Sequence, residues 1–295
     1  MNNFDKNRVA KSFGNAAASY ELHAVLQKLV AERLLSRLDL VKLAPEWIID
    51  AGSGTGISAR AMKKKYRSAR VMQIDLSSAM LFYSRKKSPR WFSRQFFVCA
   101  DAEWLPVPPA KIDLVFSSLM LHWCNDVDRV LAETRRVLRT NGLYLFATLG
   151  PGTLSELRES WAGVDKGSHV HTFIDMHDIG DALVRAGMEG VVMETENITL
   201  NYQDCGRLMR DLKALGVNNA SISRTRGLTG KHKMQRMIEN YEQYRAEGLL
   251  PASYEVIYGH AWAPAGRTQS TPAGHTVLVP LTSIKRNKMR NRHVN

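Results

Sequence analysis

A chain of 295 residues with 44% hydrophobic and 23% charged residues has the composition of a globular protein with one sizeable core. No stretch approaches about 18 uninterrupted apolar residues, so we expect neither a transmembrane helix nor a membrane partner. The N-terminus lacks the apolar core and cleavage site of a secretory signal. Three scattered cysteines, Cys99, Cys124 and Cys205, indicate neither a disulfide framework nor a metal site. These features fit a protein of the reducing cytoplasm.

The net charge of +13 favours an acidic partner, which is a nucleic acid, an anionic membrane or an acidic protein. Residues 264–295 contain six lysines and arginines and no acid, so this segment supplies nearly half of the excess. Charge alone does not choose among the three classes of partner.

The first predicted elements are helices within residues 8–40, where apolar residues recur every three or four positions. After Pro45, strand and helix signals alternate up to residue 149. Short apolar runs predict strands at 47–50, 71–74, 96–99, 112–117 and 143–149. Such alternation predicts a parallel sheet with crossover helices.

The clearest crossover helix is "DVDRVLAETRRVLRTNG", which we expect to begin after Asp126 as N-cap and to stop at Asn141–Gly142. Farther along, "IDMHDIGDALVRAGM" predicts a helix that Asp175 opens.

"GVVMETENITL" predicts a strand, residues 203–247 look mostly helical, and "YEVIYGHAWA" predicts the last strand. The predicted organisation is N-terminal cap helices 1–45, a core 46–200, a helical insertion 201–252, a last core strand 253–263 and a basic tail 264–295.

The stretch "IIDAGSGTG" at 48–56 is a strand that feeds a glycine-rich turn. Such a turn lets the backbone approach a ligand and exposes free N–H groups at the start of a helix. Gly52, Gly54 and Gly56 form GxGxG, and Ile57 replaces the third glycine of the dinucleotide fingerprint. A P-loop is excluded because no Gly-Lys-Ser/Thr follows.

Three acids follow successive predicted strands. Asp75 ends "VMQID" and can accept hydrogen bonds from both hydroxyls of a ribose, and Asp101 ends the next strand, where it can accept an adenine amine. Asp50 stands before the glycines and suits a water or an ammonium. Each acid alone could be a solvated strand end. All three meet at the carboxyl edge of a parallel sheet, where open α/β folds bind ligands.

The motifs "IIDAGSGTG", "QIDLSSAM", "ADAEWLP" and "FSSLMLHWCND" resemble the sequential motifs of class I S-adenosylmethionine-dependent methyltransferases. The resemblance implies a Rossmann-like α/β fold whose seven-stranded, mostly parallel sheet has the order 3-2-1-4-5-7-6, with the last strand antiparallel and a helical cap. It also implies S-adenosylmethionine as cofactor and S-adenosylhomocysteine as product. Asp50 and the glycines would face the methionine part, Asp75 the ribose and Asp101 the adenine. The cofactor residues so implied are Asp50, Gly52, Gly54, Gly56, Asp75, Leu76, Met80, Asp101, Ala102 and Ser117.

Three outer segments, 9–27, 206–220 and 254–263, resemble the malonyl-acyl-carrier-protein O-methyltransferase family, the BioC type of biotin synthesis. In that family the free carboxylate of a malonyl thioester becomes a methyl ester, so that fatty-acid enzymes can elongate the chain toward the pimeloyl precursor. The resemblance implies malonyl-acyl carrier protein or malonyl-coenzyme A as acceptor. It does not extend to 264–295.

A malonyl carboxylate is ionised at neutral pH and needs a positioned cation rather than a base. Arg210 is the first candidate, since a guanidinium grips a carboxylate in fixed geometry, and the alternative is a surface arginine paired with Asp211 or Glu247. Tyr20 is the second candidate, since its hydroxyl could hydrogen-bond the substrate carboxylate or the amino-acid end of the cofactor, and packing is the alternative. Candidates for lining the acceptor site are three histidines that could equally be structural, His122, His169 and His171.

A basic cluster in the predicted insertion could dock an acidic acyl carrier protein or be an ordinary solvated surface. It consists of Arg224, Arg226, Lys231, Lys233 and Arg236. A nucleic-acid partner is less favoured, because the cluster has no interleaved aromatic residues on which bases stack.

Two other functions remain open at this point. One is a small-molecule methyltransferase of the quinone-biosynthesis or aconitate type, which would share the core and differ in the outer segments. The other is a non-catalytic assembly factor or RNA-binding protein that binds the same cofactor, which the net charge allows.

Overall fold

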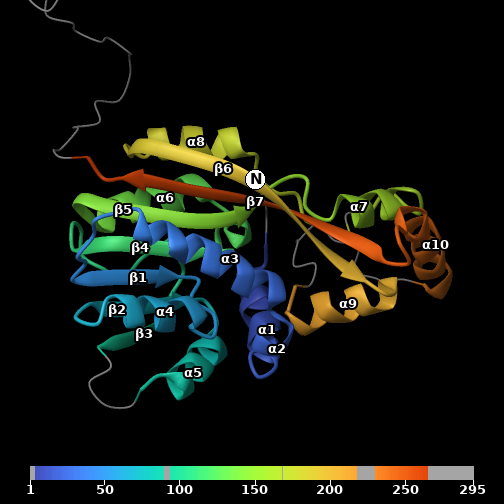
Figure 1. Ribbon diagram of the computed structural model, residues 1–295, viewed down its shortest axis with the longest axis horizontal. Helices are drawn as coiled ribbons and strands as arrows, with labels where there is room; N and C mark the ends of the chain where they lie inside the picture. The colour runs from blue at the N-terminus through green and yellow to red at the C-terminus, as the bar shows by residue number, and fades with distance from the viewer. Residues whose placement is uncertain (1–3, 90–93, 168, 218–229, 265–295) are drawn as a thin grey trace, which may run out of the picture.

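The computed structural model describes residues 4–89, 94–167, 169–217 and 230–264. One sheet of seven strands organises them in the order β3-β2-β1-β4-β5-β7-β6 (Figure 1). Strand β7 is antiparallel to both of its neighbours, and the other neighbouring strands pair in parallel. The predicted fold class and strand order are therefore confirmed. The strands are β1 (Trp47–Ala51), β2 (Arg70–Asp75), β3 (Gln95–Cys99), β4 (Ile112–Ser118), β5 (Leu138–Leu149), β6 (Glu189–Tyr202) and β7 (Leu250–Trp262).

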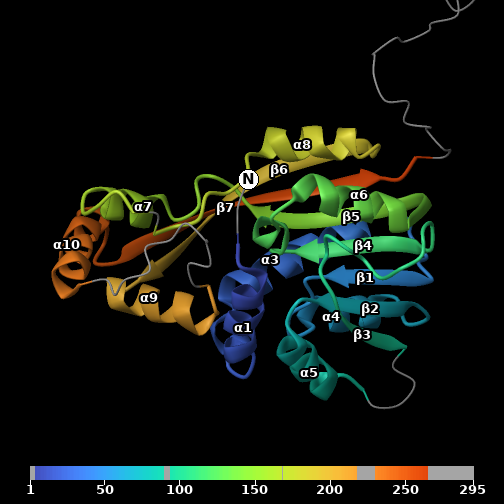
Figure 2. The same ribbon diagram turned by 180° about the vertical axis from the view of Figure 1, so that it is seen from behind.

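The helices lie in two layers, one on each face of the sheet, because the central parallel strands are apolar on both faces. α3 and α4 cover one face, and α6 and α8 cover the other (Figures 1 and 2). The helices are α1 (Lys6–Ala16), α2 (Tyr20–His23), α3 (Val25–Ser36), α4 (Ile57–Lys65), α5 (Ser78–Lys87), α6 (Val127–Val137), α7 (Ser155–Ala162), α8 (Met176–Arg185), α9 (Cys205–Ala214) and α10 (Lys231–Tyr241). Short 3-10 turns are η1 (Arg37–Asp39), η2 (Leu121–Trp123) and η3 (Glu242–Tyr244).

Helix α6 begins as predicted, since the Asp126 side chain accepts a hydrogen bond from the backbone N–H of Arg129. Its predicted end at Asn141–Gly142 is wrong. The helix stops at Val137, because Leu138 is fully buried and already pairs with Ile112 as the start of β5. Asn141 takes its left-handed conformation, at φ 58°, inside that irregular strand. Asp175 caps α8 as expected.

Two groups of helices gather beyond the carboxyl ends of the parallel strands. α1 and α2 stand directly at this edge, and α9 lies beside them (Figure 1). The long strands β6 and β7 reach past the rest of the sheet, and α7 and α10 pack together near their far ends. The edge that the sequence predicted for a ligand is therefore enclosed by segments from both ends of the chain. Within the described ranges, none of the helices combines the length and the apolar character that crossing a membrane requires.

Candidate active site

The glycine loop after β1 is held in place by Asp75. One carboxylate oxygen of Asp75 accepts a hydrogen bond from the backbone N–H of Gly54, and the other accepts one from Ser77, each at 2.8 Å. Gly52 has φ +72°, and a Cβ there would overlap the side chain of Met120. Burial raises the pKa of Asp75, and the two backbone hydrogen bonds oppose that shift. Asp75 thus shapes the loop and keeps lone pairs for a ligand.

Gly56 has a different role from the one predicted. Its φ of +79° starts helix α4, and a Cβ at this position would overlap the Ser84 hydroxyl of α5. The residue is a glycine because the loop packs against that helix, and Gly56 does not line the cavities described below.

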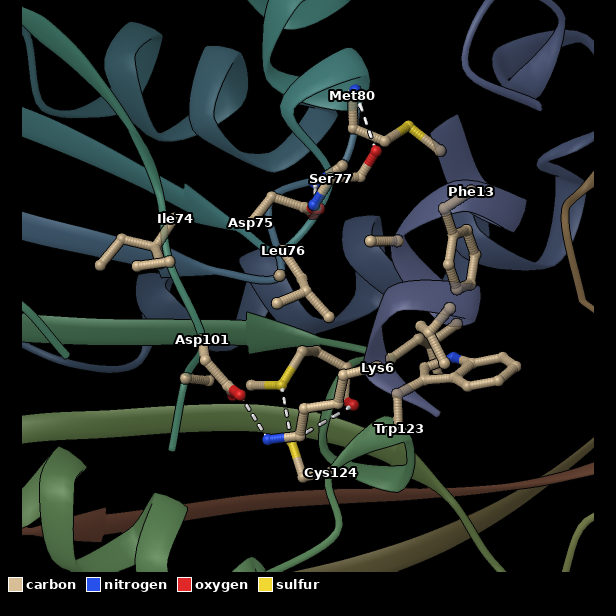
Figure 3. A pocket seen from close by; sticks show the side chains of 18 of the residues that line it. Lys6, Phe13, Ile74, Asp75, Leu76, Ser77, Met80, Asp101, Trp123 and Cys124 are labelled. Carbon is tan, nitrogen blue, oxygen red and sulfur yellow. Dashed lines mark hydrogen bonds and ion pairs between the residues drawn. The ribbon is translucent and has the colours of Figure 1, made fainter. Parts of the chain in front are cut away.

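A cavity of about 110 Å³ runs along the carboxyl ends of β1, β2 and β3, and we call it the cofactor cavity. Seven of the predicted cofactor residues line it, namely Gly52, Gly54, Asp75, Leu76, Met80, Asp101 and Ala102. Phe13 and Tyr20 cover it from the N-terminal helices, and Figure 3 shows Phe13 across from Asp75. Ser117 is corrected by one residue, because Ser117 is fully buried in β4 whereas Ser118 lines the cavity.

The Asp101 end of the cofactor cavity contains a cation that the sequence did not reveal. Lys6 of α1 forms an ion pair with Asp101 (Figure 3). It forms a second ion pair with Glu103, at 2.6 Å. Burial opposes the charge of Lys6, but the hydrogen bonds to both acids raise its pKa overall. Because Lys6 lies 95 residues from Asp101 in the chain, no local pattern could have indicated the pair.

The other end of the site is a small cavity of about 50 Å³ beside the glycine loop, which we call the Asp50 cavity. Asp50 is only 1% exposed, and burial, followed by the charge of Asp75, raises its pKa to about 7. Three buried oxygens here lack a hydrogen-bond partner among the described residues: Asp50 Oδ2, Ser53 Oγ and Gln27 Oε1. A set of unpaired acceptors fits a ligand that carries several N–H donors, such as an ammonium.

A third cavity, of about 500 Å³, adjoins the cofactor cavity, and we call it the acceptor cavity. Four residues line both spaces and form their junction, namely Phe13, Tyr20, Leu119 and Trp123. The remaining wall is mostly apolar and comes from α3, α9, β6 and β7, for example Leu26, Leu212, Leu200 and Tyr254. The arrangement allows a group bound at one side of the junction to reach a group bound at the other.

Tyr20 is the one described residue that lines all three of these cavities. Burial, with a smaller contribution from the charge of Asp75, strongly raises the pKa of its hydroxyl. The phenol therefore stays protonated at neutral pH and acts as a hydrogen-bond donor. This placement is compatible with either predicted role of Tyr20, contact with the cofactor or contact with the acceptor.

The three candidate histidines lie in two different places. His122 and His171 line the acceptor cavity. His169 does not, because its ring stacks on Trp161 at 3.7 Å and its Nε2 lies 2.8 Å from Asp165. Of the three predicted histidines, His169 is therefore the one that the structure places outside the acceptor cavity.

Arg210 is placed away from all three cavities. Its side chain is 72% exposed, and its nearest carboxylate is Asp204, at 4.0 Å, rather than Asp211 or Glu247. Arg207, one turn earlier on α9, lines the acceptor cavity instead, and its guanidinium donates a hydrogen bond to the side-chain oxygen of Gln203, at 3.5 Å. Arg210 therefore does not line the cavity in which it was predicted to bind a carboxylate, and Arg207, which does line it, was not among the predicted residues.

The basic cluster is described only in part. Arg224 and Arg226 lie outside the described residues, as do residues 265–295 of the tail. Lys231 and Lys233 are exposed on α10, outside the acceptor cavity, and Lys233 pairs with Asp165 at 2.9 Å. These lysines are therefore surface groups and not part of the cavity wall.

Comparison with known proteins gives matches to the core and to the whole chain. Residues 49–146 match a family model described as a methyltransferase domain. A malonyl-[acyl-carrier protein] O-methyltransferase of Laribacter hongkongensis is 51% identical over 89% of the chain and 91% of the relative. Proteins with the same name from Gallionella capsiferriformans and Halorhodospira halophila are 47% and 42% identical, over 90% and 96% of the chain and 94% and 97% of the relatives.

Solved structures support the fold. The YcgJ protein of Bacillus subtilis superposes with a TM-score of 0.58 at 15% identity, over 79% of the chain and 98% of that protein. Phosphoethanolamine N-methyltransferase 2 of Haemonchus contortus, solved with S-adenosyl-L-methionine, has a TM-score of 0.53 at 17% identity, over 85% of the chain and 57% of that protein.

Proposed function

The chain belongs to the malonyl-[acyl-carrier protein] O-methyltransferase family, and we propose that it transfers a methyl group from S-adenosylmethionine to the free carboxylate of malonyl-acyl carrier protein. The product is a malonyl methyl ester for synthesis of the biotin precursor, and malonyl-coenzyme A is the alternative thioester. In this scheme, residues 1–45 and 201–252 are the cap over a methyltransferase core.

The junction between two unlike cavities is the observation that carries this proposal. Tyr20, Phe13, Leu119 and Trp123 separate a narrow cavity with acids at its ends from a wide apolar one. Burial lowers the pKa of His122 in the wide cavity to about 3, so this imidazole is neutral and a poor general base. A carboxylate acceptor requires no deprotonation.

The cofactor residues fit S-adenosylmethionine, which when bound supplies an electrophilic methyl group on a positively charged sulfur. Asp75 retains acceptor capacity for ribose hydroxyls beside its two backbone hydrogen bonds. The unpaired oxygens of Asp50, Ser53 and Gln27 can accept hydrogen bonds from the α-ammonium group. The carboxylate of Asp101 can accept one from the adenine amine while it also pairs with Lys6.

The apolar wall of the acceptor cavity is suited to a reaction between an anion and a cation. The carboxylate anion and the sulfonium cation neutralise each other as the methyl ester forms. A site of low dielectric destabilises the two charged reactants more than the less charged transition state, and so lowers the barrier. Leu26, Leu200, Leu212 and Tyr254 supply such a wall. Phe13 and Trp123 at the junction exclude water and hold the two reacting groups close together.

A carrier protein also needs a surface. The exposed Arg207 lines the acceptor cavity and is suited to the phosphate of the carrier's prosthetic arm. The lysines of α10, together with Arg224 and Arg226, are suited to the acidic surface that we expect of the carrier protein, and would increase the rate of encounter.

The test is transfer of radiolabelled methyl from S-adenosylmethionine to four acceptors: malonyl-carrier protein, malonyl-coenzyme A, free malonate and RNA. We expect the highest kcat/KM for malonyl-carrier protein and a base-labile ester as product. Cofactor binding without transfer to either malonyl thioester would contradict the proposal. Transfer to RNA, or to free malonate in preference to both thioesters, would favour the rival functions.

A further inference from the structure

A buried hydrogen bond joins His122 of η2 to Thr148 of β5. His122 Nδ1 lies 3.2 Å from the Thr148 hydroxyl. His122 is 7% exposed and Thr148 is 1% exposed, and His122 lines the acceptor cavity. Phe173 packs edge-on against the imidazole at 5.7 Å, and Trp123 packs at 5.6 Å, so the orientation of the ring is restricted.

The burial of Thr148 determines which way this hydrogen bond runs. A hydroxyl whose proton has no acceptor is costly in a site of this burial. Among the described residues, His122 Nδ1 is the one side-chain partner of the Thr148 hydroxyl. If Thr148 donates, its proton is satisfied and Nδ1 accepts. Since burial also keeps the ring neutral, its single proton then resides on Nε2.

The two ring nitrogens therefore differ in what they face. Nδ1 is directed to the sheet, where Thr148 sits, and Nε2 lies on the other edge of a ring that lines the acceptor cavity. A neutral N–H on this wall is a donor for an oxygen of a molecule in the cavity. Trp123, the neighbour of His122, belongs to the junction, so the donor is close to the place of reaction.

We propose that Thr148 holds His122 as the Nε2–H tautomer, and that His122 donates a hydrogen bond to the malonyl carboxylate oxygen that is not methylated. The inference rests on the proposed function and names the positioning residue and the acceptor-binding residue of its site. The Nε2–H group of His122 and the hydroxyl of Tyr20 are then two neutral donors for one carboxylate. Neutral donors orient the anion without the stronger pairing of a guanidinium, which would reduce the nucleophilicity of the attacking oxygen.

The tautomer can be measured without any reaction. We would record nitrogen-15 NMR spectra of the imidazoles in the full-length protein between pH 6 and pH 8, using His122→Gln to assign the His122 signals. Wild type should show a protonated Nε2 and an unprotonated Nδ1 throughout. Thr148→Val removes the hydroxyl at nearly constant shape, and should give a mixture of the two tautomers. A wild-type ring with its proton on Nδ1 would overturn the inference.

A double-mutant cycle tests the link to the substrate. Loss of a hydrogen bond to a carboxylate should reduce kcat/KM for malonyl-carrier protein by about thirtyfold in His122→Phe, and Thr148→Val, which leaves part of the rings in the productive tautomer, should reduce it by about fivefold. The double variant should be no worse than His122→Phe, because Thr148 acts only through the ring. His122→Gln, which keeps an amide donor, should recover activity to within about threefold of wild type.

Calorimetry should give S-adenosylhomocysteine an unchanged affinity in all four variants, and thermal unfolding shows whether each variant is folded. Additive losses in the double variant, or full activity in a folded His122→Phe, would overturn the inference. If His122→Phe does not fold, the inference is tested by the tautomer and the kinetics of Thr148→Val and by the kinetics of His122→Gln. A wild-type protein with the Nε2–H tautomer but no methyl transfer would contradict the proposed function and, with it, the role in substrate binding.

Discussion

The cofactor cavity and the acceptor cavity meet at Tyr20 but are built in different ways. The cofactor cavity takes most of its wall from the ends of consecutive strands between residues 52 and 124, with acids at fixed points. The acceptor cavity takes its wall from segments as far apart as Phe13 and Tyr254, and most of these side chains are apolar. The first arrangement recognises a ligand by hydrogen bonds, whereas the second excludes water and depends on a few polar groups.

This difference predicts how the two cavities respond to substitution. Polar contacts in the cofactor cavity are numerous and locally held, so removing one should reduce affinity for the cofactor and leave the acceptor step intact. In the acceptor cavity, Tyr20, His122 and Arg207 supply donors on a wall that is mostly apolar but has other polar side chains, among them His23, His171 and Asp211. Substitutions there should alter kcat/KM for the acceptor and leave cofactor affinity near its original value.

The largest effect is expected for Asp75→Ala. This change removes the ribose acceptor and also releases the backbone N–H groups of Gly54 and Ser77, so the glycine loop loses its anchor. We expect affinity for S-adenosylhomocysteine to fall by about 3 kcal/mol, roughly a hundredfold. Calorimetry measures it, and Asp128→Ala is a matched control, since Asp128 pairs with Arg185 on the surface. Unchanged affinity would remove Asp75 from the cofactor site.

Tyr20→Phe sharpens the comparison, because Tyr20 lines both cavities. Loss of a hydroxyl that donates to a carboxylate should decrease kcat/KM for malonyl-carrier protein by about thirtyfold. The phenyl ring still fills the junction, so affinity for S-adenosylhomocysteine should change by less than about threefold. If calorimetry instead shows a large decrease in affinity for S-adenosylhomocysteine, the Tyr20 hydroxyl binds the cofactor rather than the acceptor.

The pH dependence of cofactor binding tests the Asp50 cavity. Burial raises the pKa of Asp50 to about 7, so at pH 6 the carboxyl is largely protonated. An ammonium favours the ionised form, and binding must then release a proton. Affinity for S-adenosylhomocysteine should therefore rise about tenfold from pH 6 to pH 8.

Calorimetry in buffers of different ionisation enthalpy measures both the affinity and the proton release. Asp50→Asn has no titrating carboxyl, so its affinity should be lower at pH 8 and nearly independent of pH. A wild-type protein whose affinity is flat over this range would contradict the role of Asp50.

The smallest effect distinguishes two arginines on one helix. Arg207 lines the acceptor cavity, whereas Arg210 is 72% exposed and does not line it. Arg207→Ala should increase KM for malonyl-carrier protein by about three- to fivefold, and Arg210→Ala should leave kcat and KM unchanged. The opposite ranking in steady-state kinetics would restore Arg210 as the anion ligand.

The residues that sequence reasoning missed or misplaced share one property. Lys6 and Thr148 reach their partners, and Gln27 reaches the Asp50 cavity, across stretches of chain in which nothing local marks them. Arg207 and Arg210 differ by only three residues on an amphipathic helix. The polar side of such a helix is visible in the sequence, but which part of that side borders a cavity depends on the elements opposite it.

What the sequence patterns determined by themselves is the succession of strands and helices, the glycine loop and the acids at the strand ends, whereas the strand order was implied by the resemblance to class I methyltransferases. Asp75 and Asp101 could be placed because each follows its own apolar strand, and parallel strands bring their carboxyl ends to one edge. The tertiary structure alone decided the acceptor cavity, the junction at Tyr20 and the pairing of His122 with Thr148. The physical reason is that a strand and its turn are specified by neighbours in the chain, whereas a cavity wall is specified by the packing of segments that only the folded chain brings together.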